Sequence, residues 1–175
     1  MIVMNKINIL LLIGISLSIF LGACKSEQVN QNPNLDVQTV EQLKNGNIVI
    51  TTSNFTGVIL SEQFINNADY WTPTVQDIMD LEEDIQDYLA ENKSKFHASH
   101  APTGKALAKY YRQYYGMIHN GKQVIIGVYF CSSIFNNDDW KNGVVDASGG
   151  GNCFFHVEYN VNDGIFQDIF VNAPK

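Results

Sequence analysis

Residues 109–131 read KYYRQYYGMIHNGKQVIIGVYFC, and this stretch decides the fold. It contains two runs rich in aromatic and β-branched residues, 109–119 and 122–131, on either side of Asn120-Gly121. Such runs are typical of β-strands. An Asn-Gly pair favours a tight two-residue turn, because both of its residues readily take the positive φ that the turn requires. The stretch therefore predicts an antiparallel β-hairpin.

A second hairpin is expected downstream. The runs CFFHVEYNV, residues 153–161, and IFQDIFV, residues 165–171, flank a turn sequence Asn-Asp-Gly at 162–164. The segment between the two hairpins, residues 132–152, is too long for a tight turn. We expect this segment to form an ordered surface loop.

A long amphipathic helix is expected before the hairpins. Thr72 is a good N-cap with Pro73 at the first helical position, and Thr74 with Asp77 offers an alternative capping box. The helix should end near Asn92. Its apolar residues recur at helical spacing, namely Val75, Ile78, Leu81, Ile85 and Leu89.

These elements define an expected fold class. Residues 47–60 contain two β-rich pieces, NIVITT and FTGVIL, which precede the helix and the two hairpins. One amphipathic helix packed on an antiparallel meander of four or more strands is an α+β, two-layer arrangement. In its element order the chain resembles the cystatin-like class of folds. We expect a single α+β domain over residues 47–175.

The N-terminal stretch MIVMNKINILLLIGISLSIFLGAC indicates export. A single charge at Lys6 precedes an apolar run over residues 7–21, and small residues come just before Cys24. The alternative, a transmembrane helix, needs ~20 apolar residues, and this run is shorter. The sequence Leu-Gly-Ala-Cys at 21–24 resembles the lipobox of bacterial lipoprotein signals.

This resemblance implies that residues 1–23 are a signal peptide and that Cys24 is lipidated. The chain is then anchored to the cell membrane or the outer membrane, facing the periplasm or the exterior. Lys25, in place of the Asp that retains such proteins at the inner membrane, favours the outer membrane. Residues 24–46 are polar and read as a flexible tether, although the spacing of three apolar residues, 37, 40 and 43, also permits a short helix.

Cys131 and Cys153 are the two cysteines left once Cys24 carries lipid. Disulfides form in exported proteins, and adjacent antiparallel strands would bring these two residues together, so we predict a disulfide. Two buried free thiols are the alternative. Cys153 and His156 stand three residues apart on one strand, so their side chains point to opposite faces and cannot form a nucleophile–base pair. We predict neither a metal site nor a cofactor.

Two surfaces are candidates for partner contacts. Strand alternation groups Tyr110, Arg112 and Tyr114 on one face, and Tyr111 with Tyr115 on the other. One of these two sets belongs to the core. Because it contains the cation Arg112, we interpret the set of Tyr110, Arg112 and Tyr114 as an exposed partner contact. Ordinary packing between strands is the alternative. The helix also carries a stripe of carboxylates at Asp77, Asp80, Asp84, Asp87 and Glu91. This acidic stripe is either a solvated face or a docking surface for a basic protein.

Two further resemblances concern the second half of the chain. Residues 123–127, QVIIG, are similar to the Q-x-V-x-G signature of cystatin protease inhibitors, but they fall inside a predicted strand instead of a hairpin bend. Residues from about 110 to 172 also resemble a group of small bacterial proteins of unknown function, with Ser148 where an acidic residue is expected. The matching residues are Tyr111, Arg112, Gln113, Tyr114, Gly116, Gly121, Phe130, Cys131, Trp140, Gly149, Gly150, Cys153, Phe154, Phe155, Tyr159, Val171 and Asn172.

The functional hypothesis is a non-catalytic binding or accessory module anchored in the cell envelope. The alternatives are a cystatin-like protease inhibitor and a cysteine-dependent hydrolase. A net charge of −7 argues against nucleic acid as a partner, because binding phosphates needs a basic surface.

Overall fold

The computed structural model describes residues 36–135 and 137–174, all of which belong to one compact unit, Gln31–Lys175. The predicted signal peptide and Cys24 lie outside the described residues. The strands are β1 (Val37–Gln42), β2 (Ile48–Thr52), β3 (Thr56–Ile59), β4 (Tyr70–Trp71), β5 (Tyr110–His119), β6 (Lys122–Cys131), β7 (Phe154–Asn160) and β8 (Ile165–Val171). The helices are α1 (Glu62–Ile65) and α2 (Val75–Glu91). Short 3-10 turns lie at Lys93–Lys95, His97–Ser99, Leu107–Lys109, Ser132–Ile134, Asp139–Lys141 and Gly151–Cys153.

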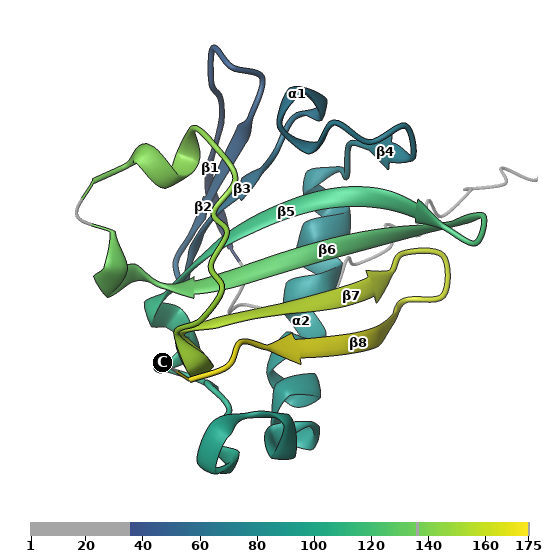
Figure 1. Cartoon of the computed structure of the whole chain (residues 1–175). Coiled ribbons are helices and arrows are strands. Elements are labelled where there is room, and N and C mark those ends of the chain that lie inside the picture. Colours follow the sequence, from purple (N-terminus) through teal and green to yellow (C-terminus); the bar gives the residue numbers. More distant parts are fainter. Residues whose placement is uncertain (1–35, 136, 175) are drawn as a thin grey trace, which may run out of the picture. The chain divides into compact units, whose positions relative to one another are not determined.

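The eight strands form one sheet with the order β1-β2-β3-β5-β6-β7-β8, and β4 pairs with β5 beyond the end of β3. Every pairing is antiparallel except that of β3 with β5. A parallel pairing needs a long crossover, and α2 lies within it. In Figure 1 the view is onto one face of the sheet, and α2 lies behind β5 to β8. The predicted α+β class, one helix packed on a meander sheet, is confirmed.

Both predicted hairpins are present. Asn120 and Gly121 join β5 to β6 with φ of 53° and 75°. Residues 161–164 join β7 to β8, and Gly164 there has φ of 65°. Local turn chemistry was therefore sufficient to place four adjacent strands of the sheet.

The predicted tether is wrong in its last part, because residues 37–42 form strand β1 on the edge of the sheet. A tight turn leads from β1 into β2, in which Leu43 N–H donates to the Asn47 carbonyl at 2.8 Å and Gly46 takes φ of 83°. Most of β1 is exposed, so its polar composition resembles that of a linker. The alternative short helix in this segment is wrong for the same reason.

Helix α2 begins with the second of the two predicted caps. Thr74 and Asp77 form a reciprocal capping box, and the helix starts at Val75 instead of Pro73. It ends at Glu91, with Asn92 as its C-cap. The side chains that it buries are Ile78, Leu81, Glu82, Ile85 and Leu89. Burying each apolar side chain in this set stabilises the fold by roughly 1.5–3 kcal/mol.

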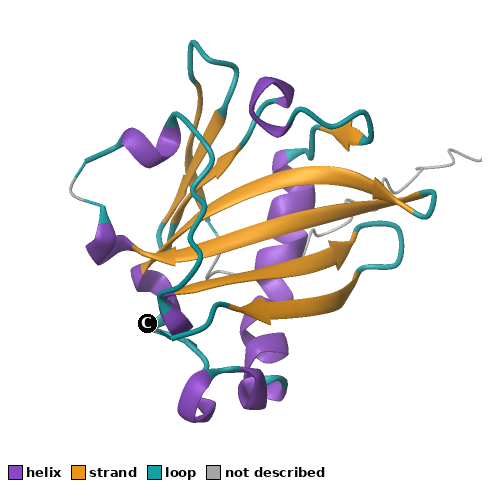
Figure 2. Cartoon of the chain, viewed as in Figure 1, coloured by secondary structure: helices purple, strands orange, loops and turns teal. Residues whose placement is uncertain are grey.

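Each face of the sheet carries its own apolar cluster. The cluster under α2 includes Ile50, Ile59, Tyr114, Ile125, Tyr129, Phe155 and Val157. The opposite cluster contains Val49, Val58, Leu60, Phe130, Trp140 and Phe154, and residues 132–153 cover part of it. Figure 2 shows this connection, mostly in the loop colour, passing in front of the strands. Along β7, Phe155 and Val157 pack under α2, whereas Phe154 belongs to the opposite cluster, where Cys153 also packs, and His156 lines a hollow on that face.

Several contacts hold the 132–153 connection against the sheet. The Gln113 amide donates to the carbonyls of Trp140 and Gly143, each at 2.6 Å, and accepts from Val145 N–H at 2.8 Å. Asn172 donates to the carbonyls of Ala147 and Gly149. A disulfide links Cys131 to Cys153 at the two ends of the connection. The predicted ordered loop is therefore held against the sheet between residues 140 and 149 and tied at its two ends.

Candidate functional site

The candidate site is a groove on the face of the sheet opposite α2. Two hollows of about 510 Å³ and 370 Å³ share the lining residues Tyr115, Ile126, Val144 and Glu158. We call the combined hollow the open-face groove. Three of the shared residues come from one row across the sheet, because Ile126 of β6 pairs with both Tyr115 of β5 and Glu158 of β7.

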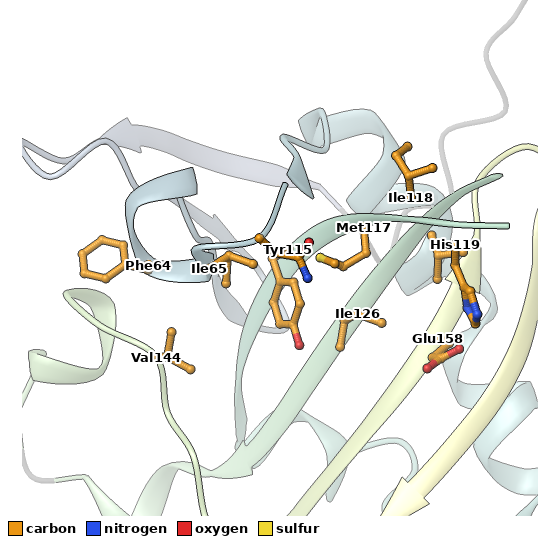
Figure 3. A pocket seen from close by; sticks show the side chains of 11 residues that line it. Phe64, Ile65, Tyr115, Met117, Ile118, His119, Ile126, Val144 and Glu158 are labelled. Atoms are coloured by element: carbon orange, nitrogen blue, oxygen red, sulfur yellow. The ribbon is translucent and has the colours of Figure 1, made fainter. Parts of the chain in front are cut away.

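The larger hollow lies beside α1. Phe64 and Ile65 of α1 form one wall, and Met117 and His119 from the end of β5 contribute to the other side. In Figure 3 the Tyr115 ring stands between the side chains of Ile65 and Ile126, and the Glu158 carboxylate lies beyond Ile126. The hollow thus has an aromatic and aliphatic middle with a carboxylate toward one end.

The smaller hollow lies beside the clamped connection. Val145, Asp146 and Ala147 line it from that connection, while Val128 and His156 line it from the sheet. The His156 ring stacks on Phe170 of β8 with a centroid distance of 5.1 Å. The groove wall is therefore built from a segment whose position depends on Gln113, Asn172 and the disulfide.

The charged side chains that line the groove are mostly carboxylates. Glu158 and Asp146 are among the lining residues of the two hollows, and none of those residues is Lys or Arg. Burial raises the pKa of the Tyr115 hydroxyl, and the charges of Glu158 and Asp146 raise it further. Burial lowers the pKa of His156 against the opposing pull of Glu158 and Asp168. Tyr115 and His156 are consequently both neutral at pH 7.

The Glu158 carboxylate lines the larger hollow together with His119, whose ring lies beside it in Figure 3. Within residues 36–135 and 137–174, no hydrogen bond or ion pair engages the Glu158 side chain. Its partner across the strand pair is Asp168 of β8, which carries the same charge. Like charges opposite each other on neighbouring strands are destabilising, so this pair is a local electrostatic cost of the fold.

The predicted partner surface formed by Tyr110, Arg112 and Tyr114 is wrong. These side chains face α2, and their exposed fractions are only 8%, 2% and 0%. The alternation of the tyrosines was right, but the helix covers the face that the sequence analysis placed at the surface. Tyr115, on the opposite face, lines the groove instead.

Arg112 is buried because it has a buried partner, Glu82 of α2. Arg112 Nε donates to both Glu82 carboxylate oxygens, at 3.1 and 3.2 Å. The hydroxyls of Tyr114 and Tyr129 donate to Glu82 Oε1 at 2.7 and 2.6 Å. Burial, and then the negative charge of Glu82, raises the pKa of both tyrosines well above the usual value. Arg112 also donates to the Tyr110 carbonyl at 2.6 Å.

The role of Glu82 was not predicted from the sequence, although a signal was present. Glu82 falls within the apolar stripe of the helix, one position after Leu81 and three before Ile85. A carboxylate at such a position needs a buried partner, since an unpaired charge in a core is very costly. All of its contacts lie inside the protein, so we read this cluster as a structural connection between helix and sheet.

The acidic stripe on α2 lies on its outer side. Asp80, Asp84, Asp87 and Glu91 are exposed, and Asp77 is partly exposed in the capping box. Asp80 accepts a hydrogen bond from Gln76 at 2.7 Å. The arrangement permits contact with a basic partner, and that role stays a prediction.

The two cysteines of the predicted disulfide and the nearby His97 are engaged in structural contacts. Cys131 and Cys153 form the predicted disulfide, so neither offers a free thiol as a nucleophile. His97 lies 2.9 Å through Nε2 from the Asn172 carbonyl, and its backbone N–H donates to Asn152. The described residues contain no group of three or more His, Cys, Asp or Glu side chains that could hold a metal ion.

The QVIIG stretch lies wholly inside β6, where Gly127 sits close to Tyr129 and Val157 under α2. It is therefore not presented in a bend. Two of the residues that carry the expected resemblance to small bacterial proteins have packing roles: Gly116 leaves room for Trp71, and Gly150 leaves room for Phe154. These positions maintain packing and do not by themselves indicate an activity.

None of the helices in the described part of the chain has the length and apolar character required to cross a membrane. Comparisons with models of protein families, with curated proteins and with solved structures returned no match to this chain.

Proposed function

We propose that this chain is a non-catalytic binding module of the cell envelope, anchored by lipid at Cys24, and that it takes a small ligand in the open-face groove. The observation that carries the proposal is the groove itself. It has a volume of about 510 Å³ in its larger hollow, and small-molecule sites commonly measure roughly 300–1,000 Å³. It also combines an apolar middle with a few polar groups, as such sites do.

Exposed apolar side chains at the groove support the same proposal. Val144 lines both hollows and is 48% exposed, and the partly exposed Phe64, Ile65 and Met117 line the larger hollow with it. Apolar residues gathered around a hollow are typical of ligand sites, whereas scattered ones are not informative. Among the described lining residues there is no Ser, Thr or Cys, whereas His119, His156 and Glu158 are titratable.

Filling the groove tests the proposal. We expect Ile126→Trp to abolish uptake of a neutral apolar dye such as N-phenyl-1-naphthylamine, measured by its fluorescence, because the indole occupies the middle of the groove. Val40→Trp is the matched control, since Val40 is 52% exposed on β1 and lines neither hollow. Equal dye uptake by both variants and the unmodified chain would exclude the groove as a binding site.

The lipid anchor needs a separate test because it lies outside the described residues. We expect the unmodified chain to partition with membranes and Cys24→Ala to lose this partitioning. Retention of the variant in the membrane fraction would contradict lipidation at that residue.

A basic protein partner at the acidic stripe is a further part of the proposal. Exposed carboxylates along one side of α2 would steer such a partner, and the attraction would be screened by salt. We therefore expect any partner captured through α2 to be released as ionic strength rises. Salt-independent capture would argue against the stripe as the contact.

A further inference from the structure

The charge of the groove restricts what it can bind. The two carboxylates of Glu158 and Asp146 lie among its lining residues, without any Lys or Arg. His156 adds no positive charge at neutral pH because burial lowers its pKa. An anionic ligand would meet repulsion from these two carboxylates, although His119 also lines the larger hollow. A cationic group would meet complementary charge, which favours association and excludes wrongly charged ligands.

Glu158 is the group placed to receive that cation. Its side chain is partly buried, has no partner among the described residues, and stands opposite Asp168 on the neighbouring strand. A bound cation would relieve the repulsion between these two carboxylates. Hydrogen bonds between charged groups are roughly twice as strong as neutral ones, so the contact would also be a substantial source of affinity.

The rest of the groove suits an apolar body attached to the cation. The ring of Tyr115 and the side chain of Ile126 lie next to Glu158 in the same row of the sheet. An aromatic face near a carboxylate favours organic cations, because the ring attracts positive charge and also offers apolar surface. Val144, from the clamped connection, also lines the hollow, and in Figure 3 it lies on the other side of the Tyr115 ring from Ile126.

We propose that the open-face groove binds a small amphipathic organic cation, with its ammonium or guanidinium group on Glu158 and its apolar part against Tyr115 and Ile126. This inference rests on the proposed function and specifies the ligand class of the same site. A second charged group, Asp146, lines the smaller hollow and also raises the pKa of the Tyr115 hydroxyl, so it extends the negative region along the groove.

Three probes of similar shape and different charge test the ligand class. They are 2-phenylethylammonium, 2-phenylethanol and 3-phenylpropionate, titrated into the full chain near pH 7.5. Binding is followed by NMR of methyl groups in the groove, including Ile126, Val144 and Met117, and by calorimetry. We expect the cation to bind at least tenfold more tightly than the neutral probe, and the anion to bind most weakly.

Glu158→Gln isolates the contribution of the carboxylate. The amide preserves shape, so we expect affinity for the cation to fall about tenfold while affinity for the neutral probe is unchanged. Glu41→Gln is the matched control, because it makes the same substitution at an exposed position of β1 that lines neither hollow, and it should alter neither affinity. Unchanged melting temperatures of both variants would show that folding is intact.

The outcomes separate the two proposals. Equal binding of the cation and the neutral probe in the groove, unaffected by Glu158→Gln, would overturn the cationic ligand class while leaving a groove that binds ligands. Preferential binding of the anion would overturn it as well. If none of the probes shifts the groove methyl signals and dye uptake is also absent, the proposed function itself fails.

Discussion

The buried pair of Glu82 and Arg112 allows a quantitative test of how α2 is held on the sheet. Both side chains are only 2% exposed, and their closest contact is 3.1 Å. Arg112→Met keeps an unbranched apolar side chain but leaves the carboxylate without a counter-charge. Breaking a buried ion pair from one side costs about 3–5 kcal/mol. An ordinary domain is stable by only about 5–15 kcal/mol, so the variant should lose a large fraction of its stability.

A double-mutant cycle separates the pair from general packing effects. Glu82→Gln alone leaves the Arg112 cation unpaired, and we expect a loss of similar size. The combination of both substitutions removes both charges, so its cost should be smaller than the sum of the two single costs by about 2–3 kcal/mol. The measurement is urea unfolding followed by far-UV circular dichroism, with the disulfide intact.

One control variant and one milder variant accompany this cycle. Asp87→Asn on the exposed side of the same helix should change stability by no more than about 0.5 kcal/mol. If Arg112→Met fails to fold, Tyr129→Phe provides a milder perturbation, because it removes only one 2.6 Å hydrogen bond to Glu82 and should cost about 1–3 kcal/mol. If the losses in unfolding free energy of the two single variants add up to the loss of the double variant, or if each is below about 1 kcal/mol, the pair is not a coupled buried unit.

Three further perturbations have expected outcomes. Replacing both Cys131 and Cys153 by Ala opens a link across a sequence separation of 22 and should lower the free energy of unfolding by about 3 kcal/mol in urea titrations, whereas no change would show that the link adds nothing. Because the folded-state pKa of His156 lies below its ordinary value of 6.5, the unfolded chain takes up this proton first; stability should fall as pH drops below 6.5, and His156→Phe should flatten that part of the pH profile. Gly116→Ala should lower the melting temperature by several degrees because a Cβ there would overlap the facing tryptophan, whereas Gly143→Ala, in open space, should melt like the parent; equal melting of the two variants would contradict the packing argument.

Local signals in the sequence predicted much of the fold. The Asn-Gly pair at 120–121 placed the β5–β6 turn, and the capping box of Thr74 and Asp77 marked the true start of α2. Such signals work because they depend on the backbone preferences of neighbouring residues. They fail for β1, since an exposed edge strand has one-sided pairing and a composition close to that of a linker.

The groove was not predictable in the same way. Its wall comes from residues 143–147, whose positions are set by the side chains of Gln113 and Asn172, from other parts of the chain. No local sequence pattern predicts the hydrogen bonds that these two side chains make to residues 143–147. The charge of Glu158 becomes informative only once Asp168 and Tyr115 are seen beside it.

The sequence by itself determined which residues alternate along β5, where the hairpins turn, and which cysteines could meet. It could not determine which face of the sheet α2 would cover, because strand alternation is symmetric between the two faces. The tertiary structure decided that question by pairing Glu82 with Arg112, thirty positions apart, in an apolar layer where neither charge could be buried alone. Because α2 covers this face, Tyr110 and Tyr114 are buried, and Tyr115 lines the groove on the opposite face.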